Sequence, residues 1–491
     1  MAGRGQRHIV IIGGGTAGSV LAARLSEDEA KRVTLLEAGP DETAYNASVL
    51  EPARAPEAWQ GLCPVATTMM RYEGGIIPIL QGRMLGGTSA ANGLATLRGL
   101  PEDYDGWAAS GLAGWSWADV IDNFKAAETD LDFPDSPIHG ATGPLTVRRW
   151  TRGEMSRAQI AFQDAMTEIG ERAVSDINDP SQLPGIGVFP VTIQDNGERL
   201  TTSMAYLTSE VRQRENLSIR TDSAVARIQL EGNRATGVVL ENGEELAADE
   251  VVVSIGALWS PVLLMRSGIG PAAHLAEYGI RAVVDLPVGE SLHDHLGPTV
   301  PYRQEGLRGG IAGPAQSLYI GASNGKDVDY HLFPIAAAPA AEGPTMFAMA
   351  AFLLRSSGQG SVRLGDAPDA EPIVTAPPLP DDGIDRLRHA FQRIAQWEKT
   401  EAFAQSGCVP VFPCDLSEES AIPAAIARGL TSYGHMTSTC PMGTVLDADC
   451  RVLGIEGLRV VDASVMPTIP SGNTYLGCVM IAERVARKMN A

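Results

Sequence analysis

The chain has 491 residues, of which 44% are hydrophobic and 20% charged, a globular composition that excludes wholesale disorder. Its length corresponds to about three domains of ordinary size, enough to bury large cores without disulfide or metal staples. Lysine and arginine total 38 against 59 acidic residues, for a net charge of −21 with no basic tract, so nucleic acid and anionic membrane surfaces are poor partners.

The six cysteines are scattered and include no CxxC pair or zinc-type spacing. We therefore expect free thiols and a cytoplasmic protein. No apolar signal segment opens the sequence, and no stretch of about 18 apolar residues lacks a breaker, so we expect neither a signal peptide nor a membrane anchor.

The first elements form a recognisable unit. Residues 8–12 are apolar and rich in β-branched side chains, a glycine cluster follows, residues 19–28 have helical spacing, and residues 31–39 form a second apolar segment. This order predicts a strand, a tight turn, a helix and a parallel strand within about 30 residues.

Further along, local patterns predict several more elements, and no internal repeat is present. We expect two short helices in 101–128, an amphipathic helix in 154–170, a small antiparallel meander in 217–240, a buried strand in 249–257, one clear strand at 328–333, a helix over 383–405, a last strand at 458–462 and a last helix at 475–489.

The glycine cluster carries the first functional signal. Gly13-Gly14-Gly15-Thr16-Ala17-Gly18 fits G-x-G-x-x-G: Gly13 allows the turn, Gly15 lets a pyrophosphate approach the helix N-terminus, and Gly18 permits close helix–strand packing. Glu37 ends the second strand, where an acid accepts from a ribose hydroxyl. The motif serves FAD and NAD alike. Its N-terminal position, with Asp462 in the last strand, favours FAD in a domain built from both chain ends.

Longer motifs resemble the glucose–methanol–choline (GMC) oxidoreductases. They are Gly82–Ser89 with Asn92, Gly256–Gly270, Gly289–His295, His139–Leu145 and Tyr433–Gly443. The match spans residues 8–491. Segments 97–107, 114–120 and 466–474 are similar to bacterial aryl-alcohol oxidases of the 5-hydroxymethylfurfural oxidase type.

This resemblance implies a mixed α/β fold. A Rossmann-like FAD-binding domain is expected from residues 1–145, 195–300 and 431–491. An interleaved substrate domain, built on an antiparallel sheet with helices, is expected from 146–194 and 301–430.

The resemblance also implies a catalytic pair. His435 stands in a segment similar to the family's H-x-x-G-T-x-x-M-G, with Ser438 where glycine is usual, and Asn473 follows in IPSGNT. A neutral histidine accepts the hydroxyl proton of an alcohol as general base, and an amide hydrogen-bonds the same oxygen while hydride passes to flavin N5.

By the same resemblance, Asn92 and the following backbone line the flavin, Val225 holds the adenine, and Asp462 lies at the pyrophosphate or ribityl chain. Ala91 stands where some members carry a flavin-linked histidine, so the FAD is expected to be noncovalent. The predicted FAD contacts are Gly13, Gly15, Thr16, Ala17, Gly18, Glu37, Ala38, Arg83, Leu85, Gly86, Gly87, Asn92, Gly93, Leu94, Ala95, Val225, Asp462, Ala463, Asn473 and Thr474.

The expected reaction is oxidation of a primary alcohol, aromatic or furanic, to its aldehyde, with oxygen as acceptor giving hydrogen peroxide. The alternatives are a dehydrogenase passing electrons to a quinone or redox partner, a hydroxynitrile lyase, and a noncatalytic flavin-binding protein. The pocket is expected within 303–430, where Phe333, Phe347, Phe352 and Phe412 are either lining or core. His293 and His295 suggest a metal pair, but no third ligand is evident and no metal is expected. His295 is instead interpreted as a structural neighbour of the flavin domain.

Overall fold

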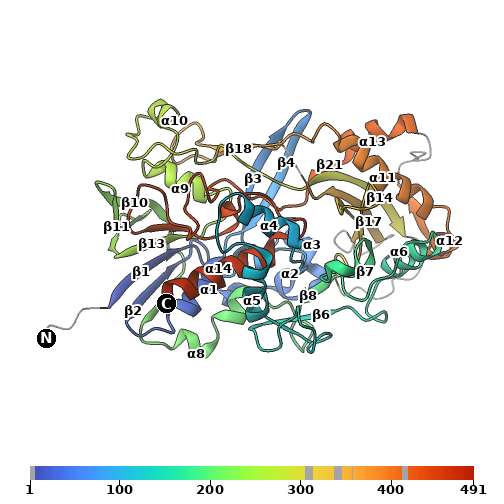
Figure 1. Ribbon diagram of the computed structural model, residues 1–491, viewed down its shortest axis with the longest axis horizontal. Helices are drawn as coiled ribbons and strands as arrows, with labels where there is room; N and C mark the ends of the chain where they lie inside the picture. The colour runs from blue at the N-terminus through green and yellow to red at the C-terminus, as the bar shows by residue number, and fades with distance from the viewer. Residues whose placement is uncertain (1–5, 305–312, 337–344, 356–357, 412–418) are drawn as a thin grey trace.

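The computed structural model describes residues 6–304, 313–336, 345–355, 358–411 and 419–491. Figure 1 shows its sheets, with both chain ends meeting at the same parallel sheet. Within the described residues, no helix has the length and apolarity needed to cross a bilayer.

The parallel sheet has five strands in the order β22-β13-β1-β2-β9. Their bounds are Arg7–Ile12 (β1), Lys31–Leu36 (β2), Leu217–Arg220 (β9), Glu250–Val253 (β13) and Leu458–Val460 (β22). With α1 at Thr16–Leu25, β1 and β2 confirm the predicted strand–helix–strand unit. The meander predicted over 217–240 is wrong in its first strand, because β9 pairs in parallel with β2.

The remainder of that segment forms a hairpin in a separate three-stranded sheet. It consists of β10 (Val225–Glu231), β11 (Arg234–Leu240) and β12 (Glu245–Ala247). Helix α14 (Thr474–Asn490) packs against α1 beside the parallel sheet (Figure 1). The last strand and helix thus return to the first ones, as the sequence predicted.

A seven-stranded antiparallel sheet forms the other half of the molecule. Its strands are β7 (Gly185–Val188), β14 (Leu296–Gln304), β15 (Ser317–Gly321), β16 (Tyr330–Ala336), β17 (Thr345–Leu353), β20 (Cys408–Pro410) and β21 (Leu430–Ser432). Where the sequence predicted one strand, the structure has β15 as well as β16.

Four helices flank this sheet and supply side chains to its apolar core. They are α6 (Arg157–Glu168), α11 (Gly383–Trp397), α12 (Glu401–Ser406) and α13 (Ile422–Gly429). The single helix predicted over 383–405 is two helices, because Thr400 caps the start of α12 with its side chain.

Two smaller sheets complete the fold. One joins β3 (Val65–Tyr72), β4 (Gly75–Gly82), β18 (Ser361–Arg363) and β19 (Ile373–Thr375), and the other joins β5 (Glu128–Asp130), β6 (Leu145–Arg149) and β8 (Pro190–Thr192). The remaining α-helices are α2 (Ala47–Leu50), α3 (Ala55–Ala58), α4 (Pro101–Ala109), α5 (Trp117–Ala127), α7 (Thr202–Tyr206), α8 (Ser209–Arg212), α9 (Ser260–Arg266) and α10 (Ala272–Glu277).

The architecture confirms the predicted mixed α/β class, with a Rossmann-like parallel sheet and a separate antiparallel sheet. The proposed domain boundaries stay a prediction. One sheet contains strands from both predicted domains, because β19, in the predicted substrate domain, pairs in parallel with β3, in the predicted FAD-binding domain.

Candidate active site

The glycine turn after β1 has little room for any other residue. Gly13 has φ +98°, and a Cβ on Gly18 would lie 1.8 Å from the carbonyl oxygen of Gly13. Gly15 is the N-cap of α1 and provides no side-chain cap, which leaves the first amides of this ten-residue helix, those of Thr16 and Ala17 among them, available to an anion.

A second glycine loop, which follows β4, faces the first. The amide of Gly86 donates to the Gly14 carbonyl at 2.8 Å, and a Cβ on Gly87 would lie 2.7 Å from the Cα of Gly15. Leu85 is buried in this loop, whereas Arg83 is exposed. The structure therefore brings two segments, far apart in sequence, into backbone contact around the dinucleotide motif.

Glu37 directly follows β2 and is buried against the turn. Its carboxylate accepts from the amides of Gly14 and Gly39 at 2.8 and 2.9 Å. Burial raises the pKa of Glu37, while these amides lower it. Ala38 follows directly, and the Glu37 carbonyl accepts from Ser223, two residues before Val225 at the start of β10. Val225 therefore lies on the neighbouring small sheet.

Asn92 is held by a buried arginine that the sequence reasoning missed. The Arg199 guanidinium donates to Asn92 Oδ1 at 2.7 Å, to the Asn92 carbonyl at 2.8 Å and to the Ser89 carbonyl at 3.2 Å. Burial lowers the pKa of Arg199 to about 10. The role of Arg199 is evident only from the carbonyl groups that surround it in the folded protein, so no local sequence pattern could have indicated it. Gly93, Leu94 and Ala95 continue the loop, and Leu94 has φ +67°.

Asp462 lies beyond the end of β22, buried, and joins three segments. It accepts from the Gly256 amide at 2.9 Å, from the Ser260 hydroxyl at 2.6 Å and from the amide and hydroxyl of Ser464. Burial raises the pKa of Asp462. These bonds fix the predicted cofactor residues Asp462 and Ala463 beside the helix that begins at Ser260.

The predicted catalytic pair is brought together. His435 Nε2 lies 3.0 Å from Asn473 Nδ2, although 38 residues separate them. Asn473 is the N-cap of α14, but its side chain makes no capping bond. A residue type that ordinarily caps a helix is instead turned toward a histidine, which leaves the α14 amides from Thr474 onward free to face an anionic group.

Two further histidines converge on His435. His295 Nδ1 lies 2.9 Å from His435 Nδ1, and the rings of His331 and His435 both pack against Tyr433. Burial lowers the pKa of His435 well below its ordinary value, and nearby His295 and His331 lower it further. Burial likewise lowers the pKa of His295 to about 3. All three rings are neutral at pH 7.

Aromatic side chains border this cluster. The Tyr433 ring lies 4.1 Å from that of His435 and stacks on Phe352 at 4.3 Å and on Phe333 at 5.4 Å, centroid to centroid. Phe347 packs elsewhere, on Tyr302. Of the four phenylalanines predicted as either lining or core, Phe333 and Phe352 are buried and stack on Tyr433, and Phe412 falls outside the described residues.

Ser438 has φ +69°, a conformation that favours glycine. This explains physically why glycine is usual there in the resembled motif. The hydroxyl of Ser438 lies 3.0 Å from the Thr437 hydroxyl and 3.3 Å from His293 Nδ1, contacts that a glycine would lack.

A second buried polar cluster surrounds His139. Its ring nitrogens lie 2.8 Å from Glu128, 3.0 Å from Asp130 and 2.8 Å from Asp176. Glu128, Asp130 and His139 form a group whose ligand atoms lie close enough for a metal ion. Arg98 pairs with Glu128, and Arg149 with Asp130 and Asp176. Three cations thus balance three carboxylates, and the cluster needs no metal ion for neutrality.

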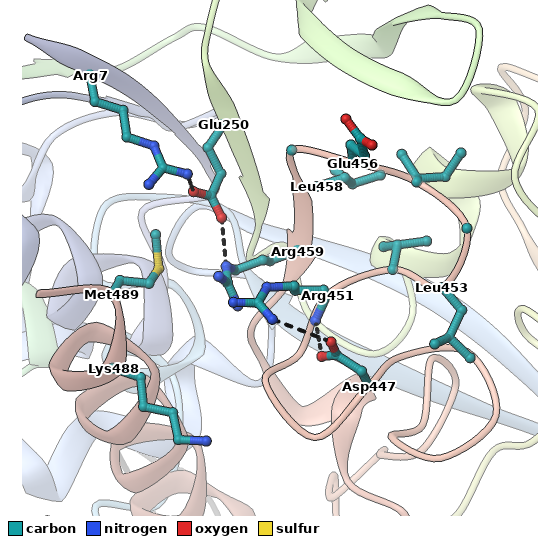
Figure 2. Close-up of a pocket in the computed structure, with 14 residues that line it drawn as sticks. Arg7, Glu250, Asp447, Arg451, Leu453, Glu456, Leu458, Arg459, Lys488 and Met489 are labelled. Atoms are coloured by element: carbon teal, nitrogen blue, oxygen red, sulfur yellow. Dashed lines mark hydrogen bonds and ion pairs between the residues drawn. The ribbon is translucent and has the colours of Figure 1, made fainter. Parts of the chain in front are cut away.

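Figure 2 shows a surface pocket of about 490 Å³ beside the parallel sheet. Arg7 and Arg459 pair there with Glu250, and Arg451 pairs with Asp447. Because Arg7 opens β1 and Glu250 opens β13, the pocket is near the end of the sheet opposite the glycine turn. Neither His435 nor Asn473 lines it, so this pocket is separate from the predicted catalytic pair.

A dinucleotide-type turn and a buried histidine–amide pair together are typical of an oxidoreductase that binds a dinucleotide cofactor. Comparison with known proteins gives the family: GMC oxidoreductase profiles match residues 8–297 and 356–482. The chain belongs to the GMC oxidoreductase family, as its motifs predicted. It is an FAD-dependent enzyme acting on CH–OH donors.

Individual relatives cover nearly the whole chain. It is 34% identical to 5-(hydroxymethyl)furfural oxidase of Methylovorus sp. (strain MP688), with 97% of each chain covered, and 33% identical to an oxygen-dependent choline dehydrogenase of Paraburkholderia phymatum, over 98% of this chain and 92% of that one. The structure resembles pyridoxine 4-oxidase from Mesorbium loti, with a TM-score of 0.88, 31% identity and 99% of each chain covered.

The residues present fit an FAD. The Gly15 side of the turn is open, since a Cβ there would meet only the Cα of Gly87, at 3.8 Å. Asn473 Oδ1 is buried and has no hydrogen-bond partner among the residues that the structure describes. The first feature suits a diphosphate at the α1 N-terminus, and the second suits a polar ligand between cofactor and pair.

Proposed function

We propose that this enzyme oxidises a primary aromatic or furanic alcohol to its aldehyde, with oxygen as the electron acceptor and hydrogen peroxide as the second product. One observation carries the proposal: the ring of Tyr433, itself stacked on Phe352 and Phe333, lies against His435 of the His435–Asn473 pair. Planar rings stack favourably on such side chains. The similarity to the furfural oxidase supports the same substrate class.

The chemistry of the pair suits alcohol oxidation. An alcohol hydroxyl that replaces the 3.0 Å contact between Asn473 Nδ2 and His435 Nε2 donates its proton to the imidazole and accepts from the amide. Asn473 holds the oxygen without competing for the proton, and the aromatic border excludes water. Bound FAD supplies the hydride acceptor. We propose that it is held noncovalently by the predicted contacts, since Ala91 offers no side chain for a histidyl link.

The choline dehydrogenase relatives raise a cationic alternative. The ring nitrogens of His435 contact His295 and Asn473, neither of which carries a negative charge to pair with a quaternary ammonium. This favours a neutral aromatic alcohol over choline. The five described cysteines are free thiols, which is usual in a reducing compartment, and we propose the cytoplasm as the location.

The proposal is tested by mixing the yellow holoenzyme anaerobically with benzyl alcohol, 5-(hydroxymethyl)furfural, pyridoxine or choline and following flavin absorbance. We expect bleaching by the aromatic and furanic alcohols and not by choline. Rapid return of colour in air, with peroxide, identifies an oxidase, whereas slow return identifies a dehydrogenase. Bleaching by choline alone contradicts the substrate class. An unbleached flavin during cyanohydrin cleavage replaces the proposal with a lyase.

A further inference from the structure

The ring contacts of His435 fix where its proton lies. A neutral histidine carries one N–H and one lone pair, so each ring nitrogen is either a donor or an acceptor. His435 has a neighbour at both: His295 at Nδ1, 2.9 Å away, and Asn473 at Nε2, 3.0 Å away. The three side chains therefore form one directed chain of hydrogen bonds.

The direction of this chain follows from Asn473. Its Nδ2 carries two hydrogens and no lone pair, so His435 Nε2 is the acceptor and the imidazole proton is on Nδ1. That proton must be accepted by His295 Nδ1, which places the proton of His295 on Nε2. The carbonyl groups of Leu354 and Pro470 raise the pKa of His295 against the larger effect of burial, and Nε2 has no hydrogen-bond partner among the described residues.

We propose that His295 is a positioning residue that holds His435 in the Nδ1–H form, so that the Nε2 lone pair is available to an alcohol that replaces its contact with Asn473. This inference rests on the proposed function, because it takes His435 as the base. His295 acts through His435 and does not contact the substrate. In the opposite tautomer, Nε2–H would point at the alcohol and could not remove its proton.

The backbone holds the two rings in register. The His295 carbonyl accepts from the Tyr433 amide at 2.9 Å, and the Asp294 carboxyl accepts from the His435 amide at 3.0 Å. His293 and Thr437 exchange a pair of backbone hydrogen bonds at 3.1 and 2.9 Å. Segment 293–295 thus runs beside segment 433–437 and presents one imidazole to the other.

Burial prevents water from readily replacing His295 as the hydrogen-bond partner of His435. His295 and His435 are 0% and 7% exposed, so water does not readily replace a lost partner. A neutral acceptor at Nδ1 also differs from a carboxylate, which would favour the imidazolium and leave no lone pair for the substrate. His295 therefore orients the base without charging it.

The test uses two variants of nearly the same shape. In His295→Asn, the amide oxygen takes the place of Nδ1 and still accepts from His435. In His295→Leu, a methyl group takes the place of Nδ1, and the acceptor is lost. The rate constant of anaerobic flavin reduction is measured in each holoenzyme, with flavin content as the folding check. We expect the rate constant of flavin reduction in the Leu variant to be on the order of 10²-fold lower than in the wild type, the loss typical of a misplaced catalytic group. The rate constant of the Asn variant should lie close to that of the wild type. Equal rates in the two variants would overturn the proposal.

A second readout needs no substrate. Nitrogen NMR of the ¹⁵N-histidine holoenzyme, assigned with His435→Gln, reports which nitrogen of His435 is protonated. We expect Nδ1–H in the wild type and Nδ1–H retained in His295→Asn, even if the Leu variant does not fold. A wild-type Nε2–H would overturn the assignment. If no alcohol reduces the flavin, the proposed function fails while the NMR result still decides the tautomer.

Discussion

The molecule contains two groups of buried histidines with opposite electrostatics. Around His435, the neighbours are other imidazoles, and the pKa falls well below its ordinary value through burial and those neighbours. Around His139, burial alone would lower the pKa, but hydrogen bonds to Asp130, Asp176 and Glu128 raise it to about 10. Burial is common to both, so the partners decide the charge.

This difference in charge suits His435 to a role as a proton acceptor and His139 to a structural role. His435 is neutral and ready to accept a proton, which suits catalysis. His139 is protonated at pH 7 between carboxylates that Arg98 and Arg149 also bind, which suits a structural role. Exchanging or removing the partners in either cluster should therefore affect activity in one case and stability in the other.

The largest expected effect is on catalysis. His435→Ala removes the base, so the rate constant of anaerobic flavin reduction should fall about 10²–10⁴-fold. Exposed His389 on α11 provides the control, and His389→Ala should reduce its flavin at the wild-type rate. A His435→Ala enzyme that reduces its flavin at nearly the normal rate would remove His435 as the base.

The next effect is on stability. His139→Leu leaves three carboxylates with two cations, and breaking such a buried network typically costs about 3–5 kcal/mol. Urea unfolding of the holoenzyme measures this. Glu154→Gln, which breaks a partly exposed pair with Arg148, should cost no more than about 1 kcal/mol. Similar losses of unfolding free energy in both variants would argue against a structural role for the His139 cluster.

A smaller, graded effect is expected with pH. Because the folded-state pKa of His139 is raised above 6.5, its stabilising contribution is complete below 6.5 and is lost as pH rises toward about 10. The difference in urea midpoint between the wild type and His139→Gln should therefore narrow from pH 6.5 to pH 10. A difference that widens over this range would contradict the assigned charge.

The smallest effect is expected at Asp294, whose pKa is raised by burial to about 7. Asp294→Asn keeps an acceptor for the His435 amide and should change flavin reduction by only a few-fold. Asp294→Leu leaves that buried amide unpaired, at about 1–3 kcal/mol, and should destabilise the fold measurably. Indistinguishable Asn and Leu variants would show that the carboxyl does not position the loop.

Sequence alone predicted what depends on local order. The strand, glycine turn and helix over residues 7–25 follow from periodicity and steric need, and the long GMC motifs carried the family and the His435–Asn473 pair. It did not predict that β9 joins the parallel sheet or that Arg199 holds Asn92, because both depend on contacts between distant segments. Sequence alone also did not predict that His295 lies against His435, because nothing in the local sequence indicates that contact.

The most direct test of the account is the pH dependence of anaerobic flavin reduction by a saturating furanic alcohol. Because the pKa of His435 lies well below 6.5, the base stays neutral, and the rate constant should be the same from pH 8 down past pH 6.5. A rate constant that falls with a midpoint near 6.5 would show an ordinary histidine at the site and would contradict a base held neutral by burial.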